Sequence, residues 1–274
     1  TMMEHQAHAF ITWNIDPVLI SFAGLEIRWY GALFALAYLM SYQTLYWIYH
    51  REGKDPSHLE KLTVYLVIAI IVGARLVHCL FYDPAYYLSH PLKILAFWEG
   101  GLASHGGGLG ALIGLYIYKL RSGDSYLWLL DRFALPTALA GAFIRIGNLF
   151  NSEIYGTPTQ VPWAFVFERV DNLPRHPAQL YEAIAYALIF AVLVMFYRRW
   201  GQRVRDGMIF GMLLVGVFSA RIAVEFVKTN QAAYTTDTWL STGQMLSLPF
   251  ILVGIILIVR ALWGSATRPS TTAG

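Results

Sequence analysis

Three arginines and one histidine are the residues of this sequence whose types best suit chemistry. Arg75, Arg145 and Arg221 lie within or at the end of long apolar runs, and His105 lies in a glycine-rich stretch. A guanidinium carries five N–H donors in a fixed fork that suits phosphate oxygens, and it keeps its charge when buried. An imidazole can accept a proton near neutral pH. These residue types indicate a site that binds an anionic headgroup and accepts a proton beside it.

The composition indicates that helices in a membrane position these side chains. Hydrophobic residues make up 57% of the 274 residues and charged residues 14%, and the mean hydropathy is +0.48. An ordinary soluble domain has about 25% charged residues, so this chain has too little polar surface for a soluble fold. We therefore predict an all-α polytopic membrane protein with seven transmembrane helices, since a bilayer core needs about 20 mostly apolar residues per helix. The expected spans are 28–49, 61–82, 101–118, 126–148, 178–197, 207–227 and 243–263.

The segments around these spans give the expected organisation of the chain. Residues 83–100 mix prolines with aromatic residues and suit a re-entrant or interfacial piece, whereas 149–177 suits a small extracytoplasmic head with a short hairpin. The expected divisions are 1–27 (outer or interfacial segment), 28–148 (helices one to four), 149–177 (periplasmic head), 178–263 (helices five to seven) and 264–274 (disordered cytoplasmic tail).

The distribution of lysine and arginine predicts the orientation of the helices. One side collects eleven basic residues, which are Arg51, Lys54, Lys61, Lys119, Arg121, Arg198, Arg199, Arg203, Arg205, Arg260 and Arg268. The other side collects four, which are Lys93, Arg169, Arg175 and Lys228. Because basic loops stay in the cytoplasm, we expect the N-terminus outside and the C-terminus in the cytoplasm. Nothing in the net charge of +3 indicates nucleic-acid binding.

This topology assigns a depth to each polar side chain. The candidates that fall in the outer half of the bilayer or in the head are Tyr30, Arg75, His105, Asn148, Asn151, Glu153, His176, Glu182, Arg221 and Glu225, together with Arg145. Only Arg132, with Asp131, is expected near the inner half. Charge at membrane depth is costly and usually functional. The alternative is that the arginines pair internally with acidic residues or extend to the interface.

The glycines beside His105 have two interpretations. Gly106 and Gly110 have small-xxx-small spacing, which lets two membrane helices approach closely. That packing role explains most of the glycines, but it does not explain an imidazole placed where the backbone is bare and a ligand can approach. We therefore include His105 and Gly106 in the site.

No metal or cofactor is expected. Cys79 is the single cysteine, so an intramolecular disulfide and a cysteine zinc site are both excluded. The histidines are scattered and lack the spacing of metal ligands. We expect Cys79 to pack in the interior, and any reacting thiol to arrive on the substrate.

Several motifs, in order, resemble those of the prolipoprotein diacylglyceryl transferase family. The run RIGNLFNSEIYG at 145–156 is similar to the family signature. The other matching pieces are RWYG at 28–31, GAR at 73–75, GGLASHGG at 100–107, RHPAQLYE at 175–182 and RIAVEF at 221–226. The chain departs from the family pattern at Ile144, Leu149, Val217 and Lys228, to none of which we assign chemistry.

The resemblance implies a bacterial inner-membrane enzyme whose site faces the outer leaflet. Its reaction would move the sn-1,2-diacylglyceryl group of phosphatidylglycerol to the lipobox cysteine of a prolipoprotein, forming a thioether and releasing glycerol 1-phosphate. This would be the first step of lipoprotein maturation. The implied partners are phosphatidylglycerol, the prolipoprotein signal peptide and membrane lipids, with no cofactor and no nucleic acid, and we expect a monomer.

Within that reaction we assign roles to individual residues. Arg145 and Arg221 hold the phosphodiester and stabilise the leaving phosphate, and His105 takes the thiol proton. In a rival assignment the arginines alone lower the thiol pKa, and His105 only orients the headgroup. The expected substrate-binding set is Tyr30, Arg75, Gly106, Asn148, Asn151, Glu153, Gly156, His176, Glu182 and Glu225. In this set Asn148, Asn151 and Glu153 would fix Arg145 and the head loop, Glu225 would orient Arg221, and Glu182 and His176 could equally be interfacial structure.

Two other classes of protein stay open. A serine lipase or intramembrane protease would use His105 with a glycine-rich oxyanion loop, but the sequence has no Gly-x-Ser-x-Gly nucleophile elbow. A transporter or flippase for an anionic lipid would also need buried arginines. Its polar residues would have to continue toward the inner face, where only Arg132 and Asp131 are expected.

Overall fold

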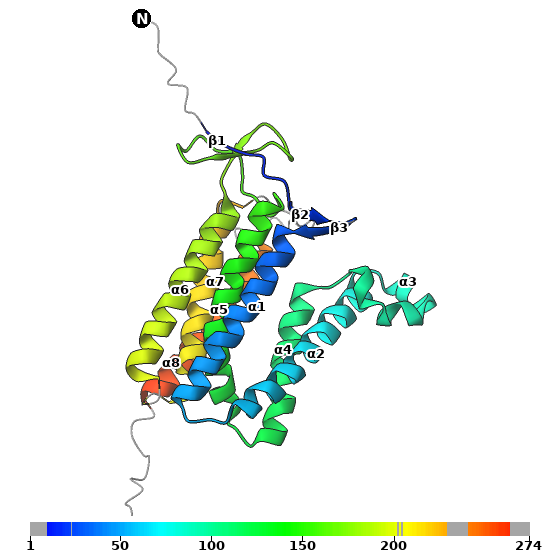
Figure 1. The fold of residues 1–274 in the computed structure, drawn as a ribbon. Helices are drawn as coiled ribbons and strands as arrows, with labels where there is room; N and C mark the ends of the chain where they lie inside the picture. The colour runs from blue at the N-terminus through cyan, green and yellow to red at the C-terminus, as the bar shows by residue number, and fades with distance from the viewer. Residues whose placement is uncertain (1–9, 23, 202, 204, 229–240, 264–274) are drawn as a thin grey trace, which may run out of the picture. The chain divides into compact units, whose positions relative to one another are not determined.

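A computed structural model describes residues 10–22, 24–201, 203, 205–228 and 241–263 of the chain. Seven helices of 18 or more residues dominate this described part (Figure 1). They are α1 (Trp29–Arg51), α2 (Pro56–Phe81), α4 (Ser104–Ser122), α5 (Tyr126–Phe150), α6 (Ala178–Trp200), α7 (Met208–Glu225) and α8 (Thr242–Trp263). Each overlaps one expected span, so the prediction of an all-α membrane protein is confirmed.

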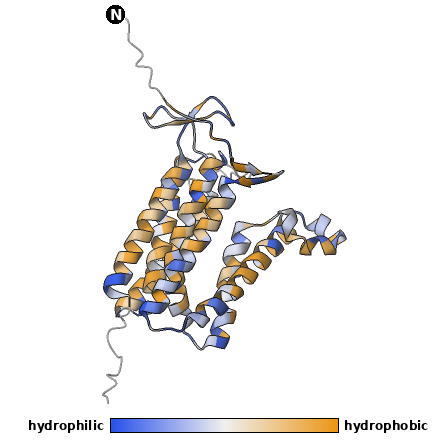
Figure 2. Ribbon diagram, in the orientation of Figure 1, coloured by the Kyte–Doolittle hydropathy of each residue, from blue (hydrophilic) through white to orange (hydrophobic). Residues whose placement is uncertain are grey.

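Five of these helices, α2 and α5 to α8, are long and apolar enough to cross a membrane. In the ribbon of Figure 2, the colouring by hydropathy marks most residues of the long helices as hydrophobic. The helices α1 and α4 are less apolar. The helix α1 carries several polar side chains, and α4 begins with a run of glycines and ends with basic residues. The described part thus has five helices that can cross a membrane by their own length and apolarity, and the count of seven spans stays a prediction.

Local sequence signals set the helix ends that differ from expectation. The helix α2 begins at Pro56, five residues before the expected start, because the Asp55 carboxylate caps it by accepting a hydrogen bond from the Ser57 N–H at 2.9 Å. The helix α4 ends where Gly123 adopts a left-handed conformation with φ +76°. Capping residues therefore extended both helices beyond their apolar cores.

The chain forms two compact units, Thr1–Thr44 with Phe133–Gly274, and Leu45–Arg132. In the first unit α7 packs against both α6 and α8. Its head has two small sheets, one of which joins β1 (Ile11–Trp13), β4 (Phe165–Phe167) and β5 (Pro174–Arg175). The strands β4 and β5 are antiparallel and form the hairpin expected within 149–177, while β1 pairs with β4 in parallel. The second sheet pairs β2 (Val18–Phe22) with β3 (Leu25–Arg28).

A small apolar core holds the head to the end of α5. Leu149, Phe165 and Phe167 are buried together, and Trp13 packs against them. The indole N–H of Trp13 also donates a hydrogen bond to the Leu149 carbonyl at 3.0 Å. Thus the N-terminal strand β1 is part of the head, which the sequence did not indicate.

In the second unit, α2 and α4 pack along a seam of glycines. A Cβ on Gly106 would lie 2.3 Å from the Gly73 carbonyl oxygen, and a Cβ on Gly110 would lie 2.1 Å from that of Ala69. The close-packing role of these glycines is therefore confirmed. Between the two helices, 83–100 forms α3 (Pro84–Ser89) and the 3-10 turns η1 (Pro91–Leu95) and η2 (Phe97–Glu99). Its interfacial placement stays a prediction.

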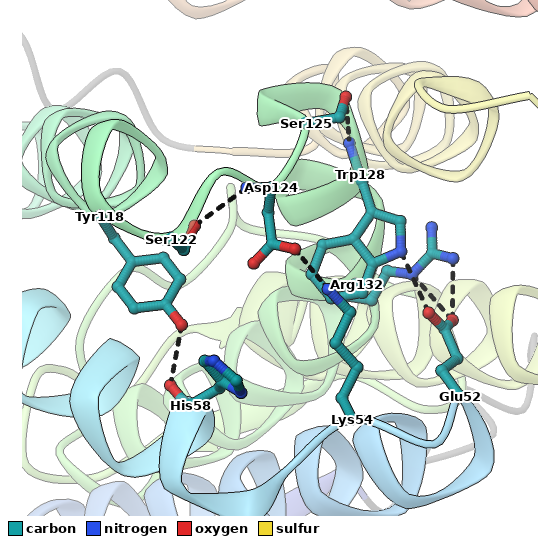
Figure 3. A network of polar contacts seen from close by, with 9 residues as sticks. All are labelled: Glu52, Lys54, His58, Tyr118, Ser122, Asp124, Ser125, Trp128 and Arg132. Carbon is teal, nitrogen blue, oxygen red and sulfur yellow. Dashed lines mark hydrogen bonds and ion pairs between the residues drawn. The ribbon is translucent and has the colours of Figure 1, made fainter.

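A polar network in this unit provides the charged side chain of Arg132 with an acidic partner (Figure 3). Glu52 accepts hydrogen bonds from the Arg132 Nε at 2.9 Å and from the Trp128 indole N–H at 3.0 Å. The cations of Arg132 and Lys54 lie 4.8 and 4.1 Å from the Trp128 ring centroid, and Lys54 pairs with Asp124. Arg132 therefore ties the α1–α2 connection to α5 as part of the structure.

Candidate functional site

The Glu182 carboxylate is the hub of the polar cluster in the first unit. Its Oε2 lies 2.9 Å from the Arg145 Nε, and its Oε1 lies 2.9 Å from the Lys228 Nζ. Glu182 is fully buried. Because Oε2 has no hydrogen-bond donor in the described part of the chain, its contact with Arg145 is an ion pair without an aimed N–H. One carboxylate thus faces two cations, and Glu182 joins Arg145 on α5 to Lys228 after α7.

A chain of amide hydrogen bonds joins Arg145 to the head loop. Asn148 accepts from the Arg145 Nη1 at 3.3 Å and donates to the Glu153 Oε1 at 2.8 Å. Asn151 donates to the same oxygen at 3.2 Å, and Gln179 donates to the Glu153 backbone carbonyl at 2.7 Å. These contacts match the expectation that Asn148, Asn151 and Glu153 fix Arg145 and the loop. Gln179, which is fully buried, was not among the predicted residues.

The loop after α5 is held in an unfavourable backbone conformation. Ser152 and Ile154 have φ values of +54° and +60°, in the left-handed region that residues with a Cβ rarely adopt. Each such residue costs on the order of 1–3 kcal/mol and persists only where its surroundings enforce it. Here the enforcement comes from the hydrogen bonds of Glu153, whose N–H also donates to the Asn148 carbonyl at 3.1 Å. Conformational strain of this kind is typical of functional loops.

Three buried oxygens in and beside this loop have no hydrogen-bond partner among the described residues. They are the Asn151 Oδ1, the Ser152 Oγ and the Gln179 Oε1. Buried polar atoms are nearly always paired in native proteins, so these oxygens are suited to accept hydrogen bonds from water or from a ligand. The loop can therefore receive hydrogen-bond donors from a ligand.

Two tyrosines border the arginines. The Tyr30 ring packs on Gly147, where an added Cβ would lie 2.8 Å from the Tyr30 Cδ2, and Tyr30 is within electrostatic range of Arg145. Tyr186 is buried, forms a side-chain hydrogen bond with Arg145 and lies within electrostatic range of Arg221. The structure thus brings the two predicted arginines to a common neighbour. Sequence reasoning missed Tyr186, although it follows Glu182 by one helical turn.

No ion pair joins Glu225 to Arg221 within the described residues, and the expected orienting role of Glu225 stays a prediction. Glu225 instead accepts a hydrogen bond from the Ser241 hydroxyl at 3.0 Å. Gly243 permits this contact, since a Cβ there would lie 2.6 Å from the Glu225 Oε1. An arginine preceding a glutamate by four residues is also the less favourable order for a helical pair. Glu225 therefore connects α7 to the start of α8.

Gly156 lies where three segments cross. Its N–H donates to the His176 carbonyl at 2.8 Å, and its backbone pairs with Lys228 in an isolated antiparallel bridge. A Cβ at this position would lie 2.5 Å from the Val227 carbonyl oxygen and 2.6 Å from the His176 Cβ. Gly156 therefore allows the close approach that brings Lys228 to Glu182.

His176 is fixed beside this crossing. Its Nδ1 lies 3.1 Å from the Tyr181 hydroxyl, and burial lowers the pKa of His176 below its usual value near 6.5. The ring is accordingly neutral at pH 7. In the adjoining hairpin, the Arg175 guanidinium holds the pKa of Asp171 below its usual range. Arg175 also donates to the Gly156 carbonyl at 3.3 Å.

The remaining predicted residues lie in the second unit. Arg75 is buried and donates to four backbone carbonyls, those of Lys93, Ile94, Gly100 and Gly101. Four of its five N–H groups are thereby used, so Arg75 organises 91–101 and has little capacity left for a substrate. His105 is exposed in the first turn of α4, and Gly106 faces α2 rather than an open surface. The approach of His105 to Arg145 stays a prediction.

The comparisons with known proteins agree on one family. The sequence profile described as prolipoprotein diacylglyceryl transferase matches residues 17–260. A phosphatidylglycerol–prolipoprotein diacylglyceryl transferase of Tolumonas auensis is 50% identical over 248 residues, which cover 90% of this chain and 96% of the relative. Proteins of the same name from Chloroherpeton thalassium and Porphyromonas gingivalis are 47% and 44% identical, covering 93% and 95% of this chain and 95% and 98% of the relatives.

Proposed function

The chain belongs to the prolipoprotein diacylglyceryl transferase family, and on that basis we propose that it transfers the diacylglyceryl group of phosphatidylglycerol to the lipobox cysteine of bacterial prolipoproteins. In this reaction a carbon–sulfur bond forms at the glyceryl carbon, while the bond from that carbon to the phosphate oxygen breaks. The thiol proton passes to a base, and glycerol 1-phosphate leaves with the bonding electrons. The product is a thioether.

The observation that carries the proposal is the pairing of one buried carboxylate with two cations. Arg145 contacts Glu182, Asn148 and Tyr186, which leaves at least two of its five N–H donors without a partner in the described structure. These donors suit the non-bridging oxygens of a phosphodiester. Since the donors are fixed before the substrate arrives, they can stabilise the charge that develops on the departing phosphate. Arg221, near the same tyrosine, is the second member of this clamp.

The head loop suits the other part of the phosphatidylglycerol headgroup. The terminal glycerol of phosphatidylglycerol carries two hydroxyl donors. The loop offers three unpaired buried acceptors, Asn151 Oδ1, Ser152 Oγ and Gln179 Oε1. A site built to pair with hydroxyls discriminates against ligands that lack them. We therefore assign recognition of the headgroup glycerol to this loop, with Tyr30 beside it.

His105 is the proposed general base for the cysteine thiol. It is exposed, and its imidazole forms no hydrogen bond with a described residue, so the ring is available to a substrate. In the rival assignment the positive field of Arg145 and Arg221 lowers the thiol pKa, and His105 orients the headgroup. A His105→Gln variant separates the two, because near-normal turnover would exclude the base role.

We place the protein in the bacterial inner membrane as a monomer with seven spans, its N-terminus outside and its site toward the outer leaflet. Eleven basic residues on one side against four on the other support this orientation. The flippase alternative is disfavoured, since the polar residue expected near the inner half, Arg132, is bound to Glu52.

The test uses detergent-purified protein with a synthetic lipobox peptide and phosphatidylglycerol labelled in its non-acylated glycerol. The proposal requires the peptide to gain one diacylglyceryl unit and an equal amount of labelled glycerol phosphate to be released. If neither product forms while a homologous enzyme is active under the same conditions, the proposed function is refuted.

A further inference from the structure

A basic cavity lies at the end of the second unit that is remote from His105. It has a volume of about 310 Å³ and is lined by His58, Lys61, Tyr65, Tyr118, Arg121 and Ser122. These residues come from the first turns of α2 and the last turns of α4. Since a helix rises 1.5 Å per residue, the distance along α4 from His105 to Arg121 is about 24 Å. The cavity therefore faces the opposite membrane interface from His105.

The cavity carries positive charge that the described residues offset only in part, since Asp55 lies within electrostatic range of His58 and Lys61. Neither Lys61 nor Arg121 forms an ion pair with a described carboxylate. The Arg121 Nη1 donates to the Tyr65 hydroxyl at 2.8 Å, and its guanidinium lies 5.8 Å from the centroid of that ring. This contact fixes the guanidinium and leaves several N–H donors free.

Three carboxylates lie nearby in the sequence, of which Glu60 is exposed and the other two are committed elsewhere. Asp55 accepts the capping hydrogen bond from Ser57, and Asp124 pairs with Lys54, as Figure 3 shows. The cavity walls are held as well, because the Tyr118 hydroxyl donates to the His58 carbonyl at 3.1 Å. The cavity is thus a preformed group of cationic and hydroxyl donors.

Apolar side chains continue from the cavity along both helices. On α2, Val64 and Ile68 are 57% and 58% exposed, and on α4, Leu120 is 63% exposed. The helix α2 is itself apolar enough to cross a membrane. Phosphate-binding donors followed by exposed apolar surface match the two parts of a phospholipid, whereas a soluble phosphate would use only the donors.

We infer that this cavity binds the phosphate-bearing headgroup of an anionic phospholipid, whose acyl chains lie along the exposed faces of α2 and α4. The inference rests on the proposed function only for its orientation, which places the cavity at the cytoplasmic leaflet. The lipid bound there is distinct from the one that donates its diacylglyceryl group. Clusters of basic residues at that leaflet are suited to anionic headgroups.

The test titrates dioleoyl phosphatidylglycerol into the delipidated full-length protein without acceptor peptide and counts bound lipids by native mass spectrometry. We expect two lipids on the wild type. In a Lys61→Gln/Arg121→Gln variant the affinity for one of them falls about 30-fold, the product of two basic contacts. The matched control, Lys119→Gln/Arg260→Gln, loses the same charge outside the cavity and binds like the wild type.

Each further outcome decides one point. If the Lys61→Gln/Arg121→Gln variant binds both lipids like the wild type, the site is refuted. If glycerol 3-phosphate displaces the second lipid at equal concentration, the cavity binds soluble phosphates and the lipid assignment is wrong. Transfer activity is measured in parallel, so a wild type that lacks it but shows the binding difference refutes the proposed function alone. Lys61→Gln by itself, which keeps the Arg121–Tyr65 contact, repeats the test if the double variant misfolds.

Discussion

Replacing Glu182 with glutamine tests the hub of the site most directly. The change keeps the side-chain volume but removes the charge that faces Arg145 and Lys228 at 2.9 Å each. At an effective dielectric constant of 20, each contact is worth about 6 kcal/mol before the cost of desolvation. Removal of one partner from a buried pair has a net cost of about 3–5 kcal/mol. We therefore expect the Tm of Glu182→Gln to fall by roughly 10 °C.

The same change should affect catalysis in a distinctive way. Without Glu182, Arg145 keeps its charge and still attracts phosphatidylglycerol, but it is no longer fixed where the phosphate leaves. We expect kcat to fall about 100-fold while KM for phosphatidylglycerol does not rise. The measurement is a steady-state transfer assay with the lipobox peptide, with Glu60→Gln as the control because Glu60 is an exposed carboxylate on α2.

A double variant separates charge balance from positioning. In Glu182→Gln/Lys228→Gln only one cation lacks its partner, so about half of the lost stability should return, with a coupling free energy of about 1–3 kcal/mol. Turnover should stay low, because Arg145 is still unanchored. The reasoning is refuted if Glu182→Gln retains turnover within about threefold and the wild-type Tm, since a buried hub cannot be removed at so little cost.

Four further predictions concern other residues of the two units. Gly156→Ala should lower the Tm and abolish transfer, because the added Cβ would lie 2.5 Å from a backbone oxygen. Gly108→Ala is the control, because open space surrounds that position, and its Tm should stay near that of the wild type in the same thermal scan. Arg75→Gln should increase proteolysis within 91–101, where four carbonyls lose their donor, and unchanged cleavage would contradict that role. The free energy of unfolding should fall as the pH drops below about 6.5. Burial lowers the pKa of His176 in the folded protein, so the unfolded chain binds the proton more readily than the folded one. His176→Gln should remove this part of the pH dependence of the Tm. His105→Gln should lower kcat at least about 100-fold in the same transfer assay if His105 is the base.

The helices and the signature loop were within reach of sequence reasoning because their causes are local. Apolar runs locate α5 to α8 within a few residues, and the residues at 145–156 that were expected to bond to one another do so. Glycine spacing likewise predicted the close contact of α2 and α4, since small residues at every fourth position face one partner.

Contacts between distant segments were out of reach, because nothing in the local pattern specifies them. Lys228 was treated as a departure from the family pattern without a role, yet it pairs with Glu182 across 46 residues of sequence. Arg75 was assigned to a substrate because its burial was visible in the sequence, whereas the carbonyls that bind it were not. Glu225 was assigned to Arg221 because four residues separate them, although Ser241 competes for its carboxylate.

The pairing of β1 with β4 also restricts how the chain can thread the bilayer. Residues 11–13 and 165–167 exchange backbone hydrogen bonds, so both segments must end on one side of the membrane, and the chain between them must cross it an even number of times. Four long helices lie in that interval, and two of them, α2 and α5, are apolar enough to cross by themselves. It follows by parity that α1 and α4 cross together or not at all. It also follows that β1 and β4 cannot pair during synthesis until residue 167 has reached the side of the membrane on which the N-terminus already lies.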